Sequence, residues 1–317
     1  MPSRFLYDLQ APYALVSSMK RHLALEDEDL VPGGRYHNLQ DLFDFPRPER
    51  SEGLARDPLP PLPHPALERS PSLLAAVAER DHILHFPYQS YEYVLRFLDE
   101  AADDPLVDRI WITLYRVARD SAVVRSLIRA AQRGVKVTAF VEVQARFDEA
   151  RNLSWAQAME AAGVEALYSK PGIKVHAKLA LVSRRIPPRE AGGPQLLAYL
   201  GTGNFNERTA GIYADHGLLT GDPRLTEDVL EVFRHLCGEV ELPQCRHLVV
   251  APFGLREWFV RMMEREARNA RSGASTGMVL KMNSLEDRDM IDALYGASMA
   301  GVRSDLIVRG ICRIRPG

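Results

Sequence analysis

Residues 112–142, ITLYRVARDSAVVRSLIRAAQRGVKVTAFVE, contain the pattern that decides the fold. Apolar runs at Ile110–Tyr115 and Val135–Val143 flank an amphipathic stretch at Ala122–Arg133, which Gly134 separates from the second run. The pattern predicts a strand, a helix that ends in a glycine turn, and a second strand. Such units place a helix on one face of a sheet, so the sequence indicates the α/β class.

The same pattern recurs 167 residues further on, in residues 279–309, where Gly301 aligns with Gly134. Unrelated strand–helix–strand units also resemble one another, but apolar positions on both sides of the glycine match as well, which favours a duplicated unit. The counterpart of His176 would fall at position 343, beyond Gly317, so the second copy is expected to be truncated.

Apolar runs and amphipathic stretches alternate from about Ser72 onward, which predicts helices packed on a largely parallel sheet. Further strands are expected at Val164–Tyr168, Val175–Val182, Leu196–Leu200, His216–Thr220, Met278–Met282 and Asp305–Val308. Further helices are expected at Tyr91–Ala102, Trp155–Ala162, Leu225–Cys237, Leu255–Ala270 and Asp287–Ala300.

The first 70 or so residues form a weaker pattern. A helix is expected at Tyr13–Leu25, a turn at Pro32–Gly34 and a short helix at Asn38–Phe45. Eight prolines between Pro46 and Pro71 predict an extended connector without helix or central strand, because proline lacks a backbone N–H.

The composition is that of an ordinary globular protein, with 46% hydrophobic and 26% charged residues, and it excludes collagenous, disordered and disulfide-scaffold classes. The sequence has no apolar stretch long enough to span a membrane and no signal-peptide pattern, and its three cysteines lack metal-like spacing. These features point to a cytoplasmic setting. A net charge of −2 argues against a protein that coats nucleic acid.

Three of the six lysines lie close to His176: Lys170, Lys174 and Lys178. In a strand, His176 and Lys178 would point to the same face, where an imidazole and an ammonium group suit an anionic ligand. The small residues of Gly201-Thr-Gly-Asn-Phe-Asn206 would let backbone N–H groups approach a phosphate, and the asparagine amides can bind oxygen atoms or orient an imidazole.

Two arginines, Arg116 and Arg146, each follow a predicted strand at the end where α/β sites assemble, and guanidinium groups bind phosphate oxygens. Arg309 would supply a matching cation from the repeated unit. Two further pairs remain open: Asp148 and Glu149 would either bind a metal directly or cap a helix, and Tyr213 and Asp215 would either belong to the site or pack in the ordinary way.

The H-x-K motif at His176, followed by G-[ST]-x-N, resembles the half-site of the phospholipase D superfamily, in which two copies build one site and one histidine is phosphorylated. Ser183 replaces the aspartate usual in that motif, which weakens a generic phospholipase assignment. Together with further stretches, the motif resembles the polyphosphate kinase family over about residues 29–317. The stretches are His85–Ser90, Thr113–Arg116, Ala145–Glu149, Pro171–Lys178, Gly201–Asn206, Tyr213–Asp215 and Val308–Gly310.

The resemblance implies a phospholipase D-like mixed sheet with flanking helices, in a duplicated unit whose second copy is truncated, after a partial α+β segment. It implies a middle-domain remnant with the proline-rich connector at 1–105, a first catalytic domain at 106–240 and the start of a second at 241–317. The family is longer than this chain at both ends.

The resemblance also assigns roles to individual residues. His176 would be the phosphorylated nucleophile, with Lys178 and Asn204 as catalytic partners. The remaining assignments are Tyr213 and Arg309 for ATP, and Arg116 and Arg146 for Mg²⁺, which a guanidinium would hold only through phosphate oxygens. The implied partners are ATP, ADP and polyphosphate, without nucleic acid, for a homo-oligomer in the cytoplasm or peripherally at the membrane.

The expected reaction is reversible transfer of the γ-phosphate of ATP to polyphosphate through phosphohistidine. Two alternatives stay open from the sequence. One is a phospholipase D-like phosphodiesterase that cleaves phospholipid or nucleic acid without ATP. The other is a catalytically incomplete fragment that binds polyphosphate without turning over ATP.

Overall fold

The computed structural model describes residues 5–36, 39, 42, 45–46, 53–54, 56–57, 59–115, 117–118, 120–142, 149–169, 174–185 and 195–315. The chain forms two compact units. The large unit is Pro58–Val250, and the small unit comprises Met1–Asp57 and Ala251–Gly317. None of the described helices combines the length and the apolar character needed to cross a bilayer.

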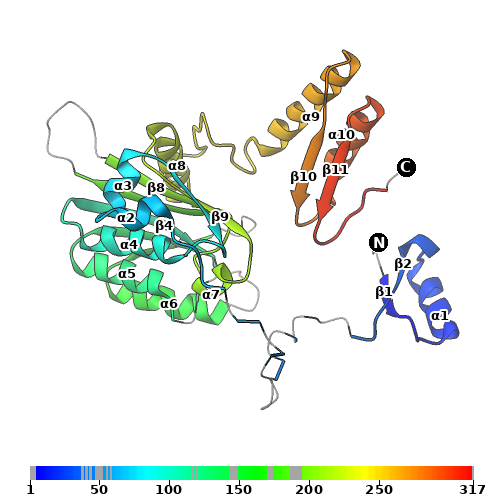
Figure 1. The fold of residues 1–317 in the computed structure, drawn as a ribbon, viewed down its shortest axis with the longest axis horizontal. Coiled ribbons are helices and arrows are strands. Elements are labelled where there is room, and N and C mark those ends of the chain that lie inside the picture. The colour runs from blue at the N-terminus through cyan, green and yellow to red at the C-terminus, as the bar shows by residue number, and fades with distance from the viewer. Residues whose placement is uncertain are drawn as a thin grey trace. The chain divides into compact units, whose positions relative to one another are not determined.

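A mixed sheet organises the large unit, and its described part has seven strands in the order β3-β9-β8-β7-β4-β5-β6 (Figure 1). The strands are β3 (His82–Phe86), β4 (Val107–Leu114), β5 (Lys136–Val141), β6 (Glu165–Tyr168), β7 (Lys178–Arg184), β8 (Gln195–Gly201) and β9 (Asp215–Thr220). β4, β5 and β6 are parallel, whereas the other neighbours pair antiparallel.

The mixed α/β class expected from the sequence is therefore confirmed. The expectation of a largely parallel sheet is wrong for the half that contains β7, β8 and β9. Parallel neighbours need a long crossover connection, and the described residues between these strands contain only the short helix Glu207–Ala210.

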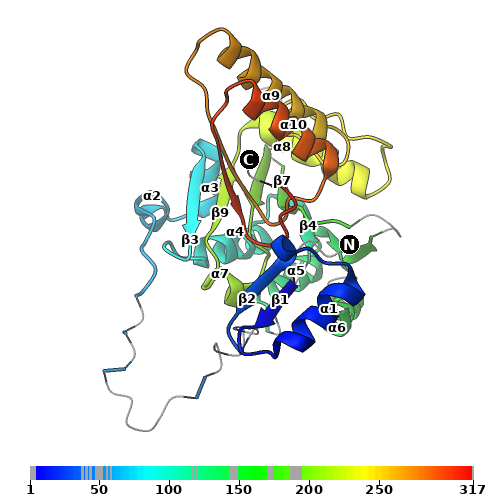
Figure 2. The ribbon, with the colours of Figure 1, turned by 90° about the vertical axis from the view of Figure 1, so that its right-hand side faces the viewer.

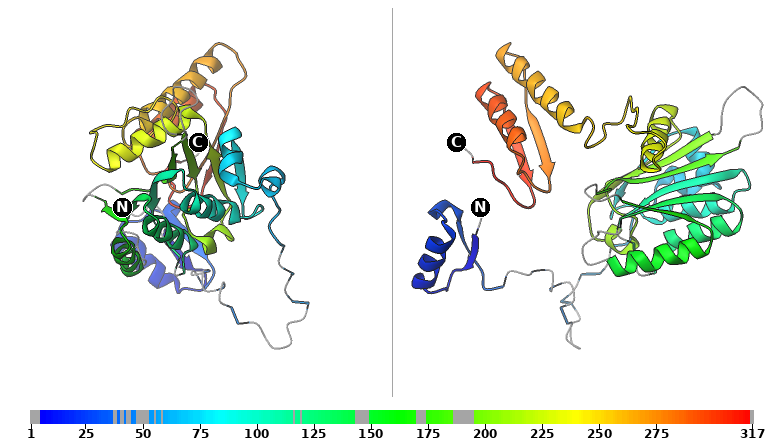
Figure 3. Two further views of the ribbon diagram at one scale, coloured as in Figure 1. Left: turned by 90° about the vertical axis from the view of Figure 1, so that its left-hand side faces the viewer. Right: turned by 180° about the vertical axis from the view of Figure 1, so that it is seen from behind.

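Two helical layers cover the sheet of the large unit (Figures 1 and 3). Helices α2 to α6 share one apolar core with the sheet, and α8 packs on the opposite face, where Phe233 lies 6.5 Å from the ring of Trp111. The helices are α2 (Pro65–Arg69), α3 (Leu73–Glu79), α4 (Glu92–Asp103), α5 (Ala122–Gln132), α6 (Glu149–Ala161), the short α7 (Glu207–Ala210) and α8 (Pro223–Leu236).

The described residues of the small unit include two pairs of parallel strands. β1 (Phe5–Asp8) pairs with β2 (Leu30–Gly33), and the segment between them contains α1 (Tyr13–Leu23) and the 3₁₀ helix Asp27–Asp29. β10 (Met278–Met282) pairs with β11 (Ser304–Val308), connected by α10 (Arg288–Met299), and α9 (Leu255–Arg271) lies beside α10 (Figure 2).

The two predicted repeats share one topology. In each, a helix joins two parallel strands and ends at a glycine with positive φ, 91° at Gly134 and 97° at Gly301. Their strand registers differ by one residue, because Ile112 pairs with Ala139 whereas Val279 pairs with Asp305. The common topology agrees with duplication, and the register distinguishes the two copies.

The proline-rich segment contradicts its prediction, because α2 begins inside it at Pro65. Proline is tolerated there because the first N–H groups of a helix have no intrahelical partner, and the ring of His64 accepts the N–H of Leu67 (3.4 Å). The pattern also missed β1, β2, β3 and α3, of which β2 replaces the turn expected at Pro32–Gly34. The short helix expected at Asn38–Phe45 lies mostly outside the described residues.

A buried carboxylate, Asp228 of α8, holds the segment that follows this helix. Its two oxygens accept the backbone N–H groups of Arg246 (3.0 Å), His247 (2.6 Å) and Leu248 (2.7 Å). Burial raises the pKa of Asp228, but these hydrogen bonds outweigh it, so the pKa lies below its ordinary value.

Asp228→Asn is expected to lower the free energy of unfolding by about 2–3 kcal/mol, because hydrogen bonds to a charged acceptor are lost. Because the pKa of Asp228 is lower in the folded protein, its carboxylate stabilises the fold at pH values above its ordinary pKa of about 4. This contribution disappears as the pH falls through the pKa in the folded protein. Urea unfolding at pH 7 and at pH 3 measures both effects. The difference between variant and parent should shrink at pH 3, and a pH-independent difference would contradict the assignment.

Candidate functional site

One edge of the large sheet collects most of the described site residues predicted from the sequence. β4, β5, β6 and β8 end at this edge, whereas the antiparallel β7 and β9 begin there. β7 lies between β4 and β8, and Lys178 at its start pairs with Gly201 at the end of β8. The topology therefore brings the segment of His176 next to the Gly201–Asn206 segment and the end of β4.

Three side chains hold consecutive backbone groups around His176, and we call Thr113, Glu142 and Lys178 the His176 clamp. The contacts are the N–H of Val175 to Oε2 of Glu142 (3.0 Å), Nζ of Lys178 to the carbonyl of His176, and Oγ1 of Thr113 to the carbonyl of Ala177 (2.7 Å). The clamp fixes the backbone while the side chain of His176 remains exposed.

The expectation that His176 and Lys178 share one face of a buried strand is wrong. β7 begins only at Lys178, whose partner Gly201 is the last residue of β8, so His176 precedes the paired strand. Lys178 is 5% exposed, whereas His176 is exposed. The two side chains therefore differ in environment: one is a buried cation, and the other is accessible to a substrate.

The ring of Tyr115 lies among the cationic groups at this edge. Its centroid is 4.9 Å from the imidazole of His176, 5.1 Å from Nζ of Lys174 and 5.3 Å from Nζ of Lys178. Aromatic faces attract ammonium groups, so Tyr115 helps to hold both lysines beside the imidazole. Lys170, the third lysine of the cluster, lies outside the described residues.

The Gly201–Asn206 segment runs beside this cluster and is held by β9. Oγ1 of Thr202 donates to Oδ1 of Asp215 (2.8 Å). A Cβ atom on Gly203 would lie 2.5 Å from Oδ2 of the same carboxylate, so this close approach requires glycine. Oδ1 of Asn204 is buried and has no hydrogen-bond partner among the described residues, so it is a buried acceptor available to a ligand or a side chain.

The side chain of Tyr199 packs against Gly201, where the Gly201–Asn206 segment begins. A Cβ atom added to Gly201 or to Gly217 would lie 2.6 Å from the ring or hydroxyl of Tyr199. The ring is 2% exposed and packs 5.3 Å from Phe205. Burial raises the pKa of Tyr199 far above its ordinary value, so the hydroxyl remains protonated.

The other predicted residues are Tyr213, Arg309, Arg116 and Arg146. Tyr213 follows α7 and is 54% exposed. Arg309 belongs to the small unit, where its Nε donates to Oδ1 of Asn283 (3.0 Å). Arg116 and Arg146 lie outside the described residues. Sequence reasoning gave no role to Glu142 or Thr113. Thr113 belongs to the stretch Thr113–Arg116 that resembles the family, whereas the signal for Glu142 was its position at a strand end near the predicted site.

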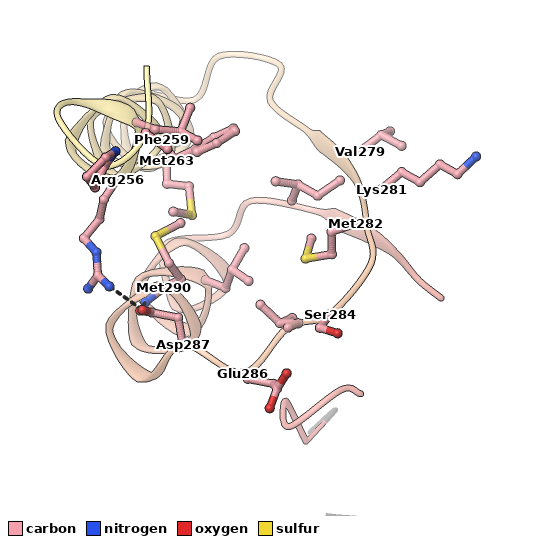
Figure 4. Close-up of a pocket in the computed structure, with 16 residues that line it drawn as sticks. Arg256, Phe259, Met263, Val279, Lys281, Met282, Ser284, Glu286, Asp287 and Met290 are labelled. Atoms are coloured by element: carbon pink, nitrogen blue, oxygen red, sulfur yellow. Dashed lines mark hydrogen bonds and ion pairs between the residues drawn. The ribbon is translucent and has the colours of Figure 1, made fainter. Parts of the chain in front are cut away.

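The small unit contains a cavity of about 550 Å³ between α9, β10 and α10 (Figure 4). Its lining is mainly apolar and includes Phe259, Met263 and Met290, and the ion pair of Arg256 with Asp287 lies beside it. An apolar lining does not suit a polyanion. The edge at His176 is therefore the candidate phosphate site.

No three His, Cys, Asp or Glu side chains of the described residues gather where they could hold a metal ion. The ammonium groups of Lys174 and Lys178 near His176 suit phosphate oxygens and do not coordinate Mg²⁺ directly, and the carboxylates of Glu142 and Asp215 accept hydrogen bonds from the protein.

The fold is that of a mixed α/β protein, and the sheet edge at His176 presents an exposed histidine near a buried lysine. Comparison with protein families gives two matches: "Polyphosphate kinase C-terminal domain 1" over residues 72–242 and "Polyphosphate kinase C-terminal domain 2" over residues 248–317. The chain therefore belongs to the polyphosphate kinase family.

Individual relatives agree with this result. The polyphosphate kinase of Escherichia coli K12 is 42% identical over 99% of this chain, and that of Vibrio vulnificus YJ016 is 41% identical over all of it. The crystal structure of polyphosphate kinase from Porphyromonas gingivalis matches 99% of this chain with a TM-score of 0.78 and 42% identity. The chain covers 46%, 45% and 47% of these three proteins, so it spans about half their length.

Proposed function

We propose that this chain carries the phosphorylated residue of a polyphosphate kinase, which transfers the γ-phosphate of ATP reversibly to polyphosphate. The observation that supports it is the exposed imidazole of His176. The His176 clamp holds the backbone of this residue, and Lys178 and Lys174 lie nearby. An accessible imidazole next to two ammonium groups is the arrangement that phosphoryl transfer through histidine needs.

The transfer has two balanced steps. A neutral ring nitrogen of His176 attacks the γ-phosphorus of ATP, the bond to the bridging oxygen breaks, and ADP leaves with the electron pair. A terminal oxygen of polyphosphate then attacks the phosphorus of the phosphohistidine, and the imidazole leaves. Histidine suits both directions because its ordinary pKa of about 6.5 leaves it largely neutral near pH 7.

Charge neutralisation is the main catalytic requirement of phosphoryl transfer. The ammonium group of Lys178 is fixed beside His176, and Lys174 adds a second positive charge at the surface. Asn204 is proposed to orient the imidazole or a phosphate. The family resemblance extends the proposal to Tyr213 and Arg309 for ATP, and to Arg116 and Arg146 for the phosphate oxygens that carry Mg²⁺.

Incubation with γ-labelled ATP and Mg²⁺ tests the proposal. The expected result is covalent label that is stable in base, labile in acid and located by peptide mapping in the segment 174–185. Addition of polyphosphate should then remove the label from the protein. Polyphosphate binding without covalent label would select the incomplete binding fragment, and acid-stable label would exclude phosphohistidine.

A further inference from the structure

Glu142 is a buried carboxylate that neither the sequence pattern nor the proposed reaction uses. It follows β5, is 1% exposed, and its backbone N–H donates to the carbonyl of Leu114 at the end of β4 (2.8 Å). A buried charge is costly unless hydrogen bonds satisfy it. Each oxygen of Glu142 does receive one: Oε1 from Oγ of Ser169 (2.9 Å), and Oε2 from the N–H of Val175 (3.0 Å).

These contacts connect rigid and irregular parts of the chain. The backbone of Glu142 belongs to the pairing of two parallel strands, whereas residues 174–177 have no regular secondary structure. Val175 directly precedes His176, so the Glu142 carboxylate fixes the position of the backbone at His176, two residues before β7 begins. Thr113 and Lys178 hold the next two carbonyls, and Glu142 is the acidic member of the His176 clamp.

We propose that Glu142 is a positioning residue, which fixes the backbone before His176 and thereby the line along which the imidazole meets a phosphorus atom. The inference rests on the proposed function of His176. A carboxylate repels phosphate, so its value here lies in the reach of its oxygen to Val175 and not in its charge. A displacement of about 1 Å at a reacting group costs about 100-fold in rate.

Two conservative variants separate reach from charge. Glu142→Gln loses the charge but keeps the length, since its amide oxygen can accept from Val175 and its NH₂ can donate to Ser169. Glu142→Asp keeps the charge but is one methylene shorter, so its oxygen cannot reach Val175 from the same backbone position. A positioning role predicts that Glu142→Gln retains labelling and that Glu142→Asp loses it. A role as a charge or as a proton carrier predicts the reverse.

The first measurement is the single-turnover rate of labelling from γ-labelled ATP. We expect Glu142→Gln to remain within about 10-fold of the parent and Glu142→Asp to fall about 100-fold, with similar ATP affinity in both. Asp228→Asn is the matched control, because Asp228 also is a buried carboxylate that accepts backbone N–H groups but lies on α8. It should label at the parental rate, and equal slowing of all three variants would overturn the proposal.

The second measurement does not need activity. Hydrogen–deuterium exchange of the peptide containing Val175 should be faster in Glu142→Asp and parental in Glu142→Gln. If the parent chain takes up no label, the proposed function fails while the exchange pattern still tests Glu142. Parental exchange in Glu142→Asp, or fast labelling by that variant, would overturn the positioning role.

Discussion

His176→Ala is expected to reduce covalent labelling from γ-labelled ATP by at least about 10⁴-fold, because alanine offers no nucleophile and the remaining groups only position and neutralise charge. The fold should tolerate the change. The imidazole is exposed, and surface substitutions of this kind usually change stability by about 0.5 kcal/mol or less. Thermal unfolding measured beside the labelling rate separates loss of chemistry from loss of structure.

His216→Ala is the matched control for this variant. His216 also is an exposed histidine on the large sheet, and its ring stacks on that of His85 with centroids 4.5 Å apart. Labelling should stay close to the parental rate, because His216 lies on β9 and does not belong to the His176 clamp. Equal labelling of His176→Ala and the parent would remove His176 as the phosphorylated residue.

The large elements of the fold were predictable because their periodicity is strong. β10 was placed at Met278–Met282 as observed, and α5 differs from its prediction by one residue. Short or unusual elements were not predictable. β3 at His82–Phe86 alternates exposed and buried residues over only five positions. The prolines predicted no helix at α2, which begins at Pro65 and is capped by the side chain of His64.

The candidate site was predictable only as residue types along the chain. The motif at His176 and the glycine-rich segment come together because β7 and β8 are neighbours, which the sequence did not reveal. Glu142 and Val175 are far apart in sequence, and their contact depends on the order of β4, β5 and β7. Asn206 lies in the predicted glycine-rich segment, but its role in capping a helix was not expected. Its amide oxygen accepts the N–H of Thr209 at the start of α7.

Lys178→Met is expected to lower the rate of label transfer by about 10²–10³-fold while leaving the fold as stable as the parent. The lost ammonium group donates to the carbonyl of His176, the proposed phosphorylated residue, and lies 5.3 Å from the ring of Tyr115. Removing one fixed electrostatic group of this kind typically costs about 3–4 kcal/mol of transition-state stabilisation. Methionine has a similar length and removes the desolvation of a buried charge, which offsets the lost hydrogen bond to the carbonyl of His176, so the melting temperature should stay close to that of the parent.

Lys174→Met separates the buried from the exposed lysine. Lys174 lies 5.1 Å from the same ring, but its side chain is exposed and its charge is screened by salt within about 10 Å at 0.1 M. Its loss should slow labelling by less than about 10-fold, and added salt should remove most of that difference. The defect of Lys178→Met should persist in salt, because its ammonium group is 5% exposed. If Lys178→Met instead melts well below the parent, its main role is structural and the slow transfer follows from a displaced His176.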